Sequence, residues 1–255
     1  MNQEWTTFLA AQGLTADSVE QFAHIGQLDA ELDRLEGAYR ATLSRAGVTV
    51  FNARATLEDP HTVRLSSGEA LTARHILVAT GGRPFVPDVP GADLAITSNE
   101  VFHMPSFPGR VLVVGGGYIA SEFACILHGL GAQVTQLYRG AQILRGFDDE
   151  ARNLVVASMQ DRGITIQCGV TVTRLERGPG GILATSTDGE TREVDAVMYA
   201  TGRVPNTEGL GLAALGVGIG ARGQVLVDRY SQTAVPSIFA VGDVTDRINL
   251  TPVAI

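Results

Sequence analysis

Residues 111–120 read VLVVGGGYIA, and this stretch decides the fold class. The four apolar residues 111–114 predict a buried strand, and the glycines at 115–117 predict a tight turn. A helix is predicted directly after the turn, because apolar residues recur at the i, i+3, i+4 and i+7 positions from Ala120. Residues 134–138 then predict a second strand. Strand, helix and strand in this order indicate a βαβ unit with parallel strands, and therefore an α/β fold.

The glycine turn also has the pattern of a dinucleotide-binding site. Gly115, Gly117 and Ala120 form the sequence GxGxxA. Glycine at the first position allows the tight turn, glycine at the second lets a pyrophosphate approach the backbone, and a small third residue lets helix and strand pack closely. Free N–H groups at the start of the helix would bind the phosphates. The alternative is a tight turn without a ligand, which the strand–turn–helix context disfavours.

The end of the second strand indicates which dinucleotide binds. NAD sites usually carry Asp or Glu about 20 residues after the glycines, where it holds the ribose hydroxyls. Here Arg139 stands 24 residues after Gly115, and Arg145 follows it. Arginine forms charge-assisted and often bidentate bonds to phosphate, so this pair favours the 2′-phosphate of NADPH. The alternative is two surface arginines in a loop.

Composition and charge exclude some classes of function. The 255 residues carry a net charge of −8 and no run of lysine or arginine, which argues against nucleic-acid binding. No apolar stretch approaches the roughly 20 residues that cross a bilayer, and no signal peptide is evident, so we expect a cytoplasmic protein without membrane contact. Cys125 and Cys168 form no CxxC or metal-binding pattern, and we expect both in the core.

The other elements follow from periodicity and turn residues. Helices are predicted over residues 5–9, from 28 to a point before Gly47, and over 149–161. Strands are predicted at 48–50, 53–57, 63–65, 75–79, 164–168 and 238–241. Residues 170–200 predict a three-stranded antiparallel meander that ends in the apolar run 196–200.

Seven short motifs together resemble one known family. They are VGGGYIASE at 114–122, YRG at 138–140, LRGFD at 144–148, ATGGRP at 79–84, ATGRVPN at 200–206, AVGD at 240–243 and LTPVA at 250–254. In their order and spacing along the chain, these motifs are similar to those of the pyridine nucleotide-disulfide oxidoreductases, and most of all to those of glutathione reductases. The likeness runs from about residue 29 to residue 255.

The resemblance implies a Rossmann-like NAD(P)-binding domain with a three-layer ββα architecture, inserted in a partial FAD-binding domain. We expect the NADPH-binding domain at 110–226 and the two pieces of the FAD-binding domain at 28–109 and 227–255. Residues 1–27 do not resemble the family, and we interpret them as a foreign head.

The resemblance also implies roles for two candidate catalytic residues. Tyr118 would be a lid over the flavin that NADPH displaces; the alternative is an aromatic that packs in the helix core. Glu122 would lie near the flavin and pair with a lysine from a part of the family sequence that these residues do not include. The alternative for Glu122 is an ordinary carboxylate in the first turn of a helix, where it is electrostatically favourable.

Further residues are assigned to cofactors by the same resemblance. Gly202 and Arg203 would bind NADPH on the far side of its domain. Asp243 would bond the ribityl chain of FAD, unless it is only a turn residue after Gly242. The candidate FAD-binding residues are Thr80, Gly81, Asp243 and Thr251.

The implied activity is that of an NADPH-dependent flavoprotein disulfide oxidoreductase that works as a homodimer. NADPH would reduce FAD, the flavin would open a cysteine disulfide, and the thiols would reduce glutathione disulfide. Three features that the resemblance implies have no counterpart in this sequence: the N-terminal GxGxxG for FAD, the CxxxxC redox pair, and the C-terminal interface domain with an acid–base histidine. The alternatives are therefore a non-catalytic NADPH-binding module or an inactive gene fragment.

Overall fold

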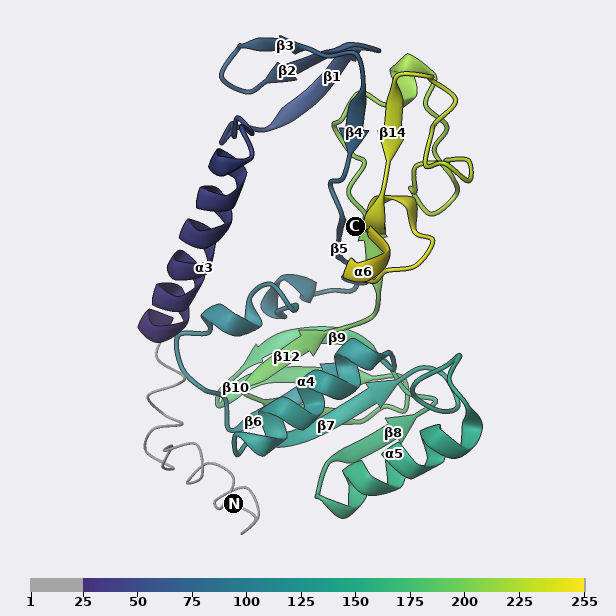
Figure 1. Cartoon of the computed structure of the whole chain (residues 1–255). Helices are drawn as coiled ribbons and strands as arrows, with labels where there is room; N and C mark the ends of the chain where they lie inside the picture. Colours follow the sequence, from purple (N-terminus) through teal and green to yellow (C-terminus); the bar gives the residue numbers. More distant parts are fainter. Residues whose placement is uncertain (1–24, 255) are drawn as a thin grey trace. The chain divides into compact units, whose positions relative to one another are not determined.

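The computed structural model describes residues 25–254 (Figure 1). These residues form two compact units, one made of 25–41 with 84–202 and the other of 42–83 with 203–254. The second unit therefore resumes at Arg203, whereas the sequence suggested that the NADPH-binding domain extends to residue 226. The assignment of cofactors to these parts of the chain stays a prediction.

The first unit is built on a parallel sheet of four strands. In spatial order these are β12 (Ala196–Tyr199), β6 (Arg110–Val114), β7 (Gln133–Tyr138) and β8 (Thr165–Cys168). The last residue of β6, Val114, pairs with Tyr199 on one side and Leu137 on the other. β6 and β7 are adjacent and parallel, with a helix between them in sequence, so the predicted βαβ unit is confirmed.

Two helices pack on one face of this sheet. α4 (Tyr118–Gly129) follows the glycine turn, and α5 (Asp149–Asp161) follows β7. Ala120 and Ala124 of α4 are fully buried in the same cluster as Val111 and Val113 of β6. The small alanine side chains allow the helix to lie close to the sheet, which places the start of α4 next to the glycine turn.

A three-stranded antiparallel sheet covers the other face. It consists of β9 (Val172–Gly178), β10 (Gly181–Ser186) and β11 (Thr191–Val194), in the order β11-β10-β9. One buried cluster joins the two sheets and contains Leu112, Val114, Leu137, Val197 and Tyr199 together with Val172, Leu175, Ala184 and Val194. The ββα architecture is therefore confirmed.

The predicted end of the meander was wrong. Residues 196–199 do not join the antiparallel sheet; they run as β12 beside β6 in the parallel sheet. Val197 and Tyr199 contribute to the core between the sheets, and Met198 contributes to the core under the helices. A strand that is buried on both faces belongs in the middle layer, and its continuous apolar run is typical of parallel sheets.

The second unit contains three small sheets. β1 (Ala55–Asp59), β2 (Thr62–Leu65) and β3 (Ala70–Thr72) are antiparallel, and β4 (Ile76–Val78) runs parallel to β14 (Ile238–Ala240). β13 (Arg203–Pro205) pairs with β5 (Gly82–Pro84) at the unit boundary. Within residues 25–254, the short helical segments are η1 (Ala92–Leu94), η2 (Val101–His103), η3 (Ala213–Leu215), η4 (Gly242–Thr245) and α6 (Thr251–Ala254). The predicted strand at 48–50 is absent: this stretch is exposed and pairs with no described strand.

α3 (Ile25–Arg45) is a long charged helix that ends before Gly47, as predicted. Its exposed surface carries Leu32, Leu35 and Tyr39 beside two ion pairs within the helix, Arg34–Glu31 and Arg40–Glu36. The charges keep its hydropathy low, and no helix among residues 25–254 is both long and apolar enough to cross a membrane. The helix predicted over residues 5–9 lies outside the described residues.

Tyr199 supplies a test of the packing between the two sheets. Its side chain is 1% exposed, its hydroxyl has no hydrogen-bond partner among the described residues, and burial raises its pKa to about 12. The pKa of Tyr199 in the folded protein exceeds its value near 10 in the unfolded chain. The contribution of the neutral side chain to stability is therefore fully present below pH 10. That contribution is lost as the pH rises through about 12.

We predict that Tyr199→Phe leaves the protein equally stable or up to about 1 kcal/mol more stable at pH 8, because it removes an unpaired buried hydroxyl. At pH 11 the advantage of the variant should grow by about 1.4 kcal/mol, since the wild-type tyrosine then resists ionisation that the unfolded chain permits. Urea unfolding of both proteins at the two pH values measures this difference. A constant difference would show that the hydroxyl is solvated in the folded protein.

Candidate dinucleotide-binding site

Gly115 occupies a position at which two strands and a helix meet. Its φ is +149°, and a Cβ atom there would lie 2.2 Å from the carbonyl oxygen of Ala200. The N–H of Gly115 donates to the carbonyl of Leu137 at 2.9 Å. The same Cβ would also approach the methyl group of Ala120 to 3.2 Å. Only glycine fits this closely packed turn, which agrees with the reason given for it from the sequence.

Gly117, in contrast, faces open space at the start of α4. A Cβ atom built on Gly117 meets nothing within 4 Å, and its backbone is extended, with φ −85°. Gly117 caps α4 without a side-chain hydrogen bond. The N–H groups of the first helical turn are therefore available to an external acceptor, and the helix dipole favours an anion there.

Gly116, the middle glycine, is fixed by an aromatic ring. A Cβ on Gly116 would lie 2.3 Å from the ring of Tyr138, and one on Gly140 would lie 2.5 Å from the same ring. Tyr138 therefore packs against two glycines, one in the turn and one just after β7. This role of Tyr138 was not predicted from the sequence, although the motifs GGG and YRG were a signal for it.

Gln136 is a buried polar residue that supports the turn from beneath. It is 0% exposed, and its Nε2 donates to the carbonyl of Gly115 at 3.0 Å and to the hydroxyl of Ser121 at 3.4 Å. Its Oε1 has no partner among the described residues. Gln136 was not predicted as a site residue from the sequence; its signal there is one amide inside the otherwise apolar end of a buried strand.

The two candidate arginines lie on the loop that follows β7. Arg139 and Arg145 are both exposed, and neither side chain has a hydrogen bond or ion pair with any residue in 30–254. The loop between them is tied to the turn, because the N–H of Leu144 donates to the carbonyl of Gly116 at 2.5 Å. The structure thus joins the glycine turn and the arginine loop through one backbone bond.

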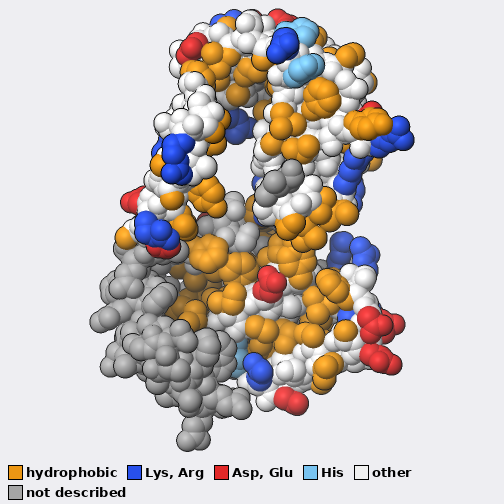
Figure 2. Space-filling view, viewed as in Figure 1, with side chains coloured by type: hydrophobic (Ala, Val, Ile, Leu, Met, Phe, Trp, Pro, Cys, Tyr) orange, Lys and Arg blue, Asp and Glu red, His pale blue; other side chains and the backbone are white. Residues whose placement is uncertain are grey.

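The exposed side of α4 carries the two candidate catalytic residues. Tyr118 is 44% exposed and Glu122 is exposed, so Tyr118 does not belong to the helix core in this unit. Ile126 is exposed on the same helix, and Figure 2 shows apolar side chains gathered on this face of the first unit. Cys125 is exposed too, which corrects our expectation of a buried thiol; it follows Glu122 by three residues and lies on the same helix face.

Cys125 and Cys168 form no disulfide with each other. Partial burial raises the pKa of the Cys125 thiol, and the charge of Arg162 opposes that effect. Cys168 is half-buried at the end of β8 and packs against the core under the helices. A thiol with a raised pKa is a poor nucleophile at neutral pH, so Cys125 is not an activated cysteine.

The second unit brings together residues that the sequence assigned to different cofactors. Arg203 donates to the carbonyl of Gly82, and its Nε lies 3.6 Å from Oδ2 of Asp243. Arg203 was predicted to bind NADPH, and Asp243 was predicted to bind FAD. Their contact shows that Arg203 has partners of its own within the second unit, on β13 next to the unit boundary.

The other candidate FAD residues are dispersed along the second unit. The Thr80 hydroxyl donates to the carbonyl of Asn206 at 2.7 Å, and the Asn206 amide donates back to the carbonyl of Thr80 at 3.1 Å. Gly81 has φ +67° and open space around it, and Thr251 is exposed at the start of α6. Gly202, at φ +128°, is the last residue of the first unit.

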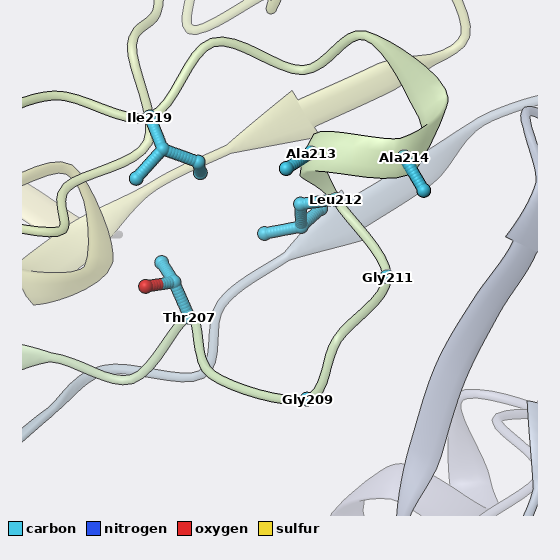
Figure 3. A pocket seen from close by; sticks show the side chains of 7 residues that line it. All are labelled: Thr207, Gly209, Gly211, Leu212, Ala213, Ala214 and Ile219. Carbon is cyan, nitrogen blue, oxygen red and sulfur yellow. The ribbon is translucent and has the colours of Figure 1, made fainter.

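A separate cavity of about 250 Å³ lies in the second unit (Figure 3). None of the predicted site residues lines it. The Thr207 hydroxyl, its only side-chain polar group, donates to the carbonyl of Gly223 at 2.7 Å. The lining residues are Thr207, Gly209, Gly211, Leu212, Ala213, Ala214 and Ile219. This cavity offers packing surface but no convergent polar groups, so the glycine turn remains the better candidate site.

Parallel strands, a glycine turn that opens a helix, and a basic loop after the second strand are the arrangement of a Rossmann-like nucleotide-binding fold. A family model described as pyridine nucleotide-disulphide oxidoreductase matches residues 5–255, so the chain belongs to that family. The match includes residues 5–27, which corrects the expectation that the first 27 residues are unlike the family.

Several curated relatives carry the name of one enzyme. The chain is 47% identical over 254 residues to the glutathione reductase of Burkholderia cepacia, covering 100% of this chain and 53% of that protein. It is 46% identical to the glutathione reductase of a Nostoc species over 91% of this chain and 53% of that protein. A trypanothione reductase of Leishmania donovani is 39% identical over 98% of this chain and 50% of that protein. The chain thus spans about half the length of these relatives.

A solved structure supports the fold. The HOCl-induced flavoprotein disulfide reductase RclA of Escherichia coli matches with a TM-score of 0.86 and 24% identity, over 94% of this chain and 57% of that chain. The fold is therefore that of the flavoprotein disulfide reductases.

Gly115 and Gly117 should respond differently to substitution by alanine. Gly115→Ala should destabilise the fold by more than about 2 kcal/mol, because it forces a Cβ into the Ala200 carbonyl and places alanine at a strained φ. Gly117→Ala should be neutral or slightly stabilising, since its backbone is extended and the space is open. Denaturant unfolding measures both. Equal losses for the two variants would contradict the distinction between a packing glycine and a ligand-facing glycine.

Proposed function

We propose that this chain binds NADPH at the glycine turn and supplies the hydride-donor part of a flavoprotein disulfide reductase. The proposal is carried by Arg139 and Arg145, which have no side-chain partner among residues 30–254 and lie on a loop bonded directly to the turn through Leu144 and Gly116. Exposed guanidinium groups without carboxylate partners beside a pyrophosphate-binding turn fit a ligand that carries an additional phosphate.

The residues present fit this dinucleotide. The first turn of α4 offers free N–H groups to the pyrophosphate, and Gly117 leaves room for the phosphate to approach them. The acidic residue nearest to Arg145, Asp148, already accepts bonds from the N–H groups of Glu150 and Ala151 as the cap of α5. The residue that directly follows β7, where an NAD site would usually carry a carboxylate, is Arg139, so NADPH is favoured over NADH.

The hydride chemistry belongs to the cofactors: NADPH would donate a hydride, and FAD would accept it and pass the electrons on. Tyr118, exposed at the start of α4, would shield the site where the nicotinamide meets the flavin. Glu122, one turn further along the helix, would provide a negative charge beside the flavin. Both roles are proposals that rest on the family and on the exposure of these side chains.

For FAD, these 255 residues supply only part of a site. Asp243 presents a carboxylate in η4 that can accept bonds from ribityl hydroxyls, and Thr80, Gly81 and Thr251 lie in the same unit. The sequence has no second GxGxxG after a buried strand, so a pyrophosphate of FAD has no matching turn here.

The substrate proposed for the whole protein is a small disulfide of the glutathione type, because several relatives are named glutathione reductases. Two electrons and two protons would convert one disulfide to two thiols. Homodimer formation and a cytoplasmic location stay predictions. The second candidate is an NADPH-binding module without turnover, and the two unpaired, widely spaced cysteines favour it for this chain alone.

Flavin content separates the two candidates. If the purified protein carries flavin and anaerobic NADPH bleaches its visible absorption, the hydride step is present. If the protein is colourless but binds NADP⁺ more tightly than NAD⁺, the binding module is favoured. Failure to bind either nucleotide would contradict both.

We predict that Arg139→Glu lowers the affinity for NADP⁺ relative to NAD⁺ by about 10- to 150-fold, the range expected from losing a charge-assisted bond worth about 1.5–3 kcal/mol. Isothermal titration with the two nucleotides measures the ratio. Arg177→Glu is the matched control, because Arg177 is an exposed arginine on β9 and its reversal changes the net charge equally. An equal effect of the control would show that overall charge, not a specific contact, sets the preference.

A further inference from the structure

The segment between the two candidate phosphate-binding arginines is held by Arg152 of α5. Its Nε donates to the carbonyl of Ile143 at 2.9 Å, and its Nη2 donates to the carbonyl of Gln142 at 3.0 Å. Its Nη1 bonds Oδ1 of Asp149 at 2.7 Å, and only 14% of the Arg152 side chain is exposed. All three nitrogens of the guanidinium are thus occupied by the loop and by its own helix.

The residue that follows these two carbonyls has an unusual backbone. Leu144 has φ +58°, a left-handed conformation that costs a non-glycine residue conformational energy. Such a conformation persists when the surroundings determine it from several sides. Here Ile143 is fully buried before it, its own N–H bonds the carbonyl of Gly116, and Arg152 fixes the two preceding carbonyls.

We propose that Arg152 is a positioning residue that determines the preference for a 2′-phosphorylated dinucleotide. By bonding the carbonyls of Gln142 and Ile143, it holds the loop so that Arg139 and Arg145, on either side, are presented together beside the glycine turn. Arg152 is assigned no contact with the nucleotide, because each of its guanidinium nitrogens already donates to the loop or to Asp149 and only 14% of its side chain is exposed. This inference rests on the proposed function, in which Arg139 and Arg145 bind the phosphate.

Arginine is suited to this role in a way that lysine is not. The planar guanidinium donates in two fixed directions, so one side chain can bind two successive carbonyls. Lysine carries the same charge but no fork. A comparison of the two side chains therefore separates loop positioning from simple electrostatic attraction of the phosphate by a nearby cation.

The test measures binding of NADP⁺ and NAD⁺ to the full 255-residue chain by isothermal titration, with circular dichroism and thermal unfolding as checks on folding. Arg152→Gln should lower the NADP⁺ preference by about tenfold, the scale of one weakened charge-assisted phosphate contact, while NAD⁺ affinity changes little. If Arg152 had a purely structural role, Arg152→Gln would weaken the binding of NADP⁺ and of NAD⁺ equally. An unchanged ratio in a folded variant would overturn the proposal.

Two further variants define the mechanism. Arg152→Lys should lose the preference as Arg152→Gln does, and full retention of it would overturn positioning in favour of a general charge effect. Asp149→Asn is the matched control, because it removes the charge of the third, exposed partner of Arg152 and leaves both carbonyl bonds. The ratio of NADP⁺ to NAD⁺ affinity in this variant should stay that of the wild type. If Arg152→Gln does not fold, the ratio of NADP⁺ to NAD⁺ affinity is measured for Arg152→Lys instead.

The dependence on the proposed function is tested by Arg139→Gln. If that substitution leaves the nucleotide ratio unchanged, the proposed function fails and the role of Arg152 fails with it. If Arg139→Gln lowers the ratio and Arg152→Gln does not, only the role of Arg152 is wrong. If both lower it, the double variant should lose less than the sum of the two effects, and a fully additive loss would overturn the action of Arg152 through the loop.

Discussion

The packing at Gly115 is the constraint on which the candidate site depends. At this residue the end of β6, the start of α4 and the Ala200 carbonyl after β12 come within a distance that admits no side chain. The approach is possible because Ala120 is also small, and it fixes where the free N–H groups of α4 lie. The site is therefore a consequence of how three elements pack. The sequence has glycine at 115 and alanine at 120 because this packing leaves no room for larger side chains.

From this point, a short series of contacts leads to the basic loop. Gln136 bonds the carbonyl of Gly115, Tyr138 packs against Gly116, and the carbonyl of Gly116 accepts the N–H of Leu144. Each contact joins the turn to β7 or to the loop after it. The two halves of the candidate site, one for the pyrophosphate and one for the 2′-phosphate, are consequently parts of one packed structure.

Much of this could be predicted from the sequence, because local patterns determine it. Continuous apolar runs, the glycine turn and helical periodicity identified β6, α4 and β7, and the family resemblance predicted the three layers. Long-range pairing was harder: the run at 196–199 could not be assigned to its sheet, since an apolar run does not reveal its neighbour. The roles of Tyr138, Gln136 and Arg152 depend on contacts between separated residues; the YRG motif and the single amide in an apolar strand hinted at the first two, and no sequence signal pointed to Arg152.

A basic loop alone does not explain selectivity for a phosphate. Exposed arginines have many rotamers, and ordering them on a ligand costs entropy that weakens binding. A loop whose backbone is already fixed reduces that cost, because only the side chains remain to be ordered. In this chain, the buried Ile143, the left-handed Leu144 and the carbonyls bonded by Arg152 fix the backbone between the two arginines. Specificity at such a site therefore depends as much on the residues that hold the loop as on the arginines that would meet the phosphate.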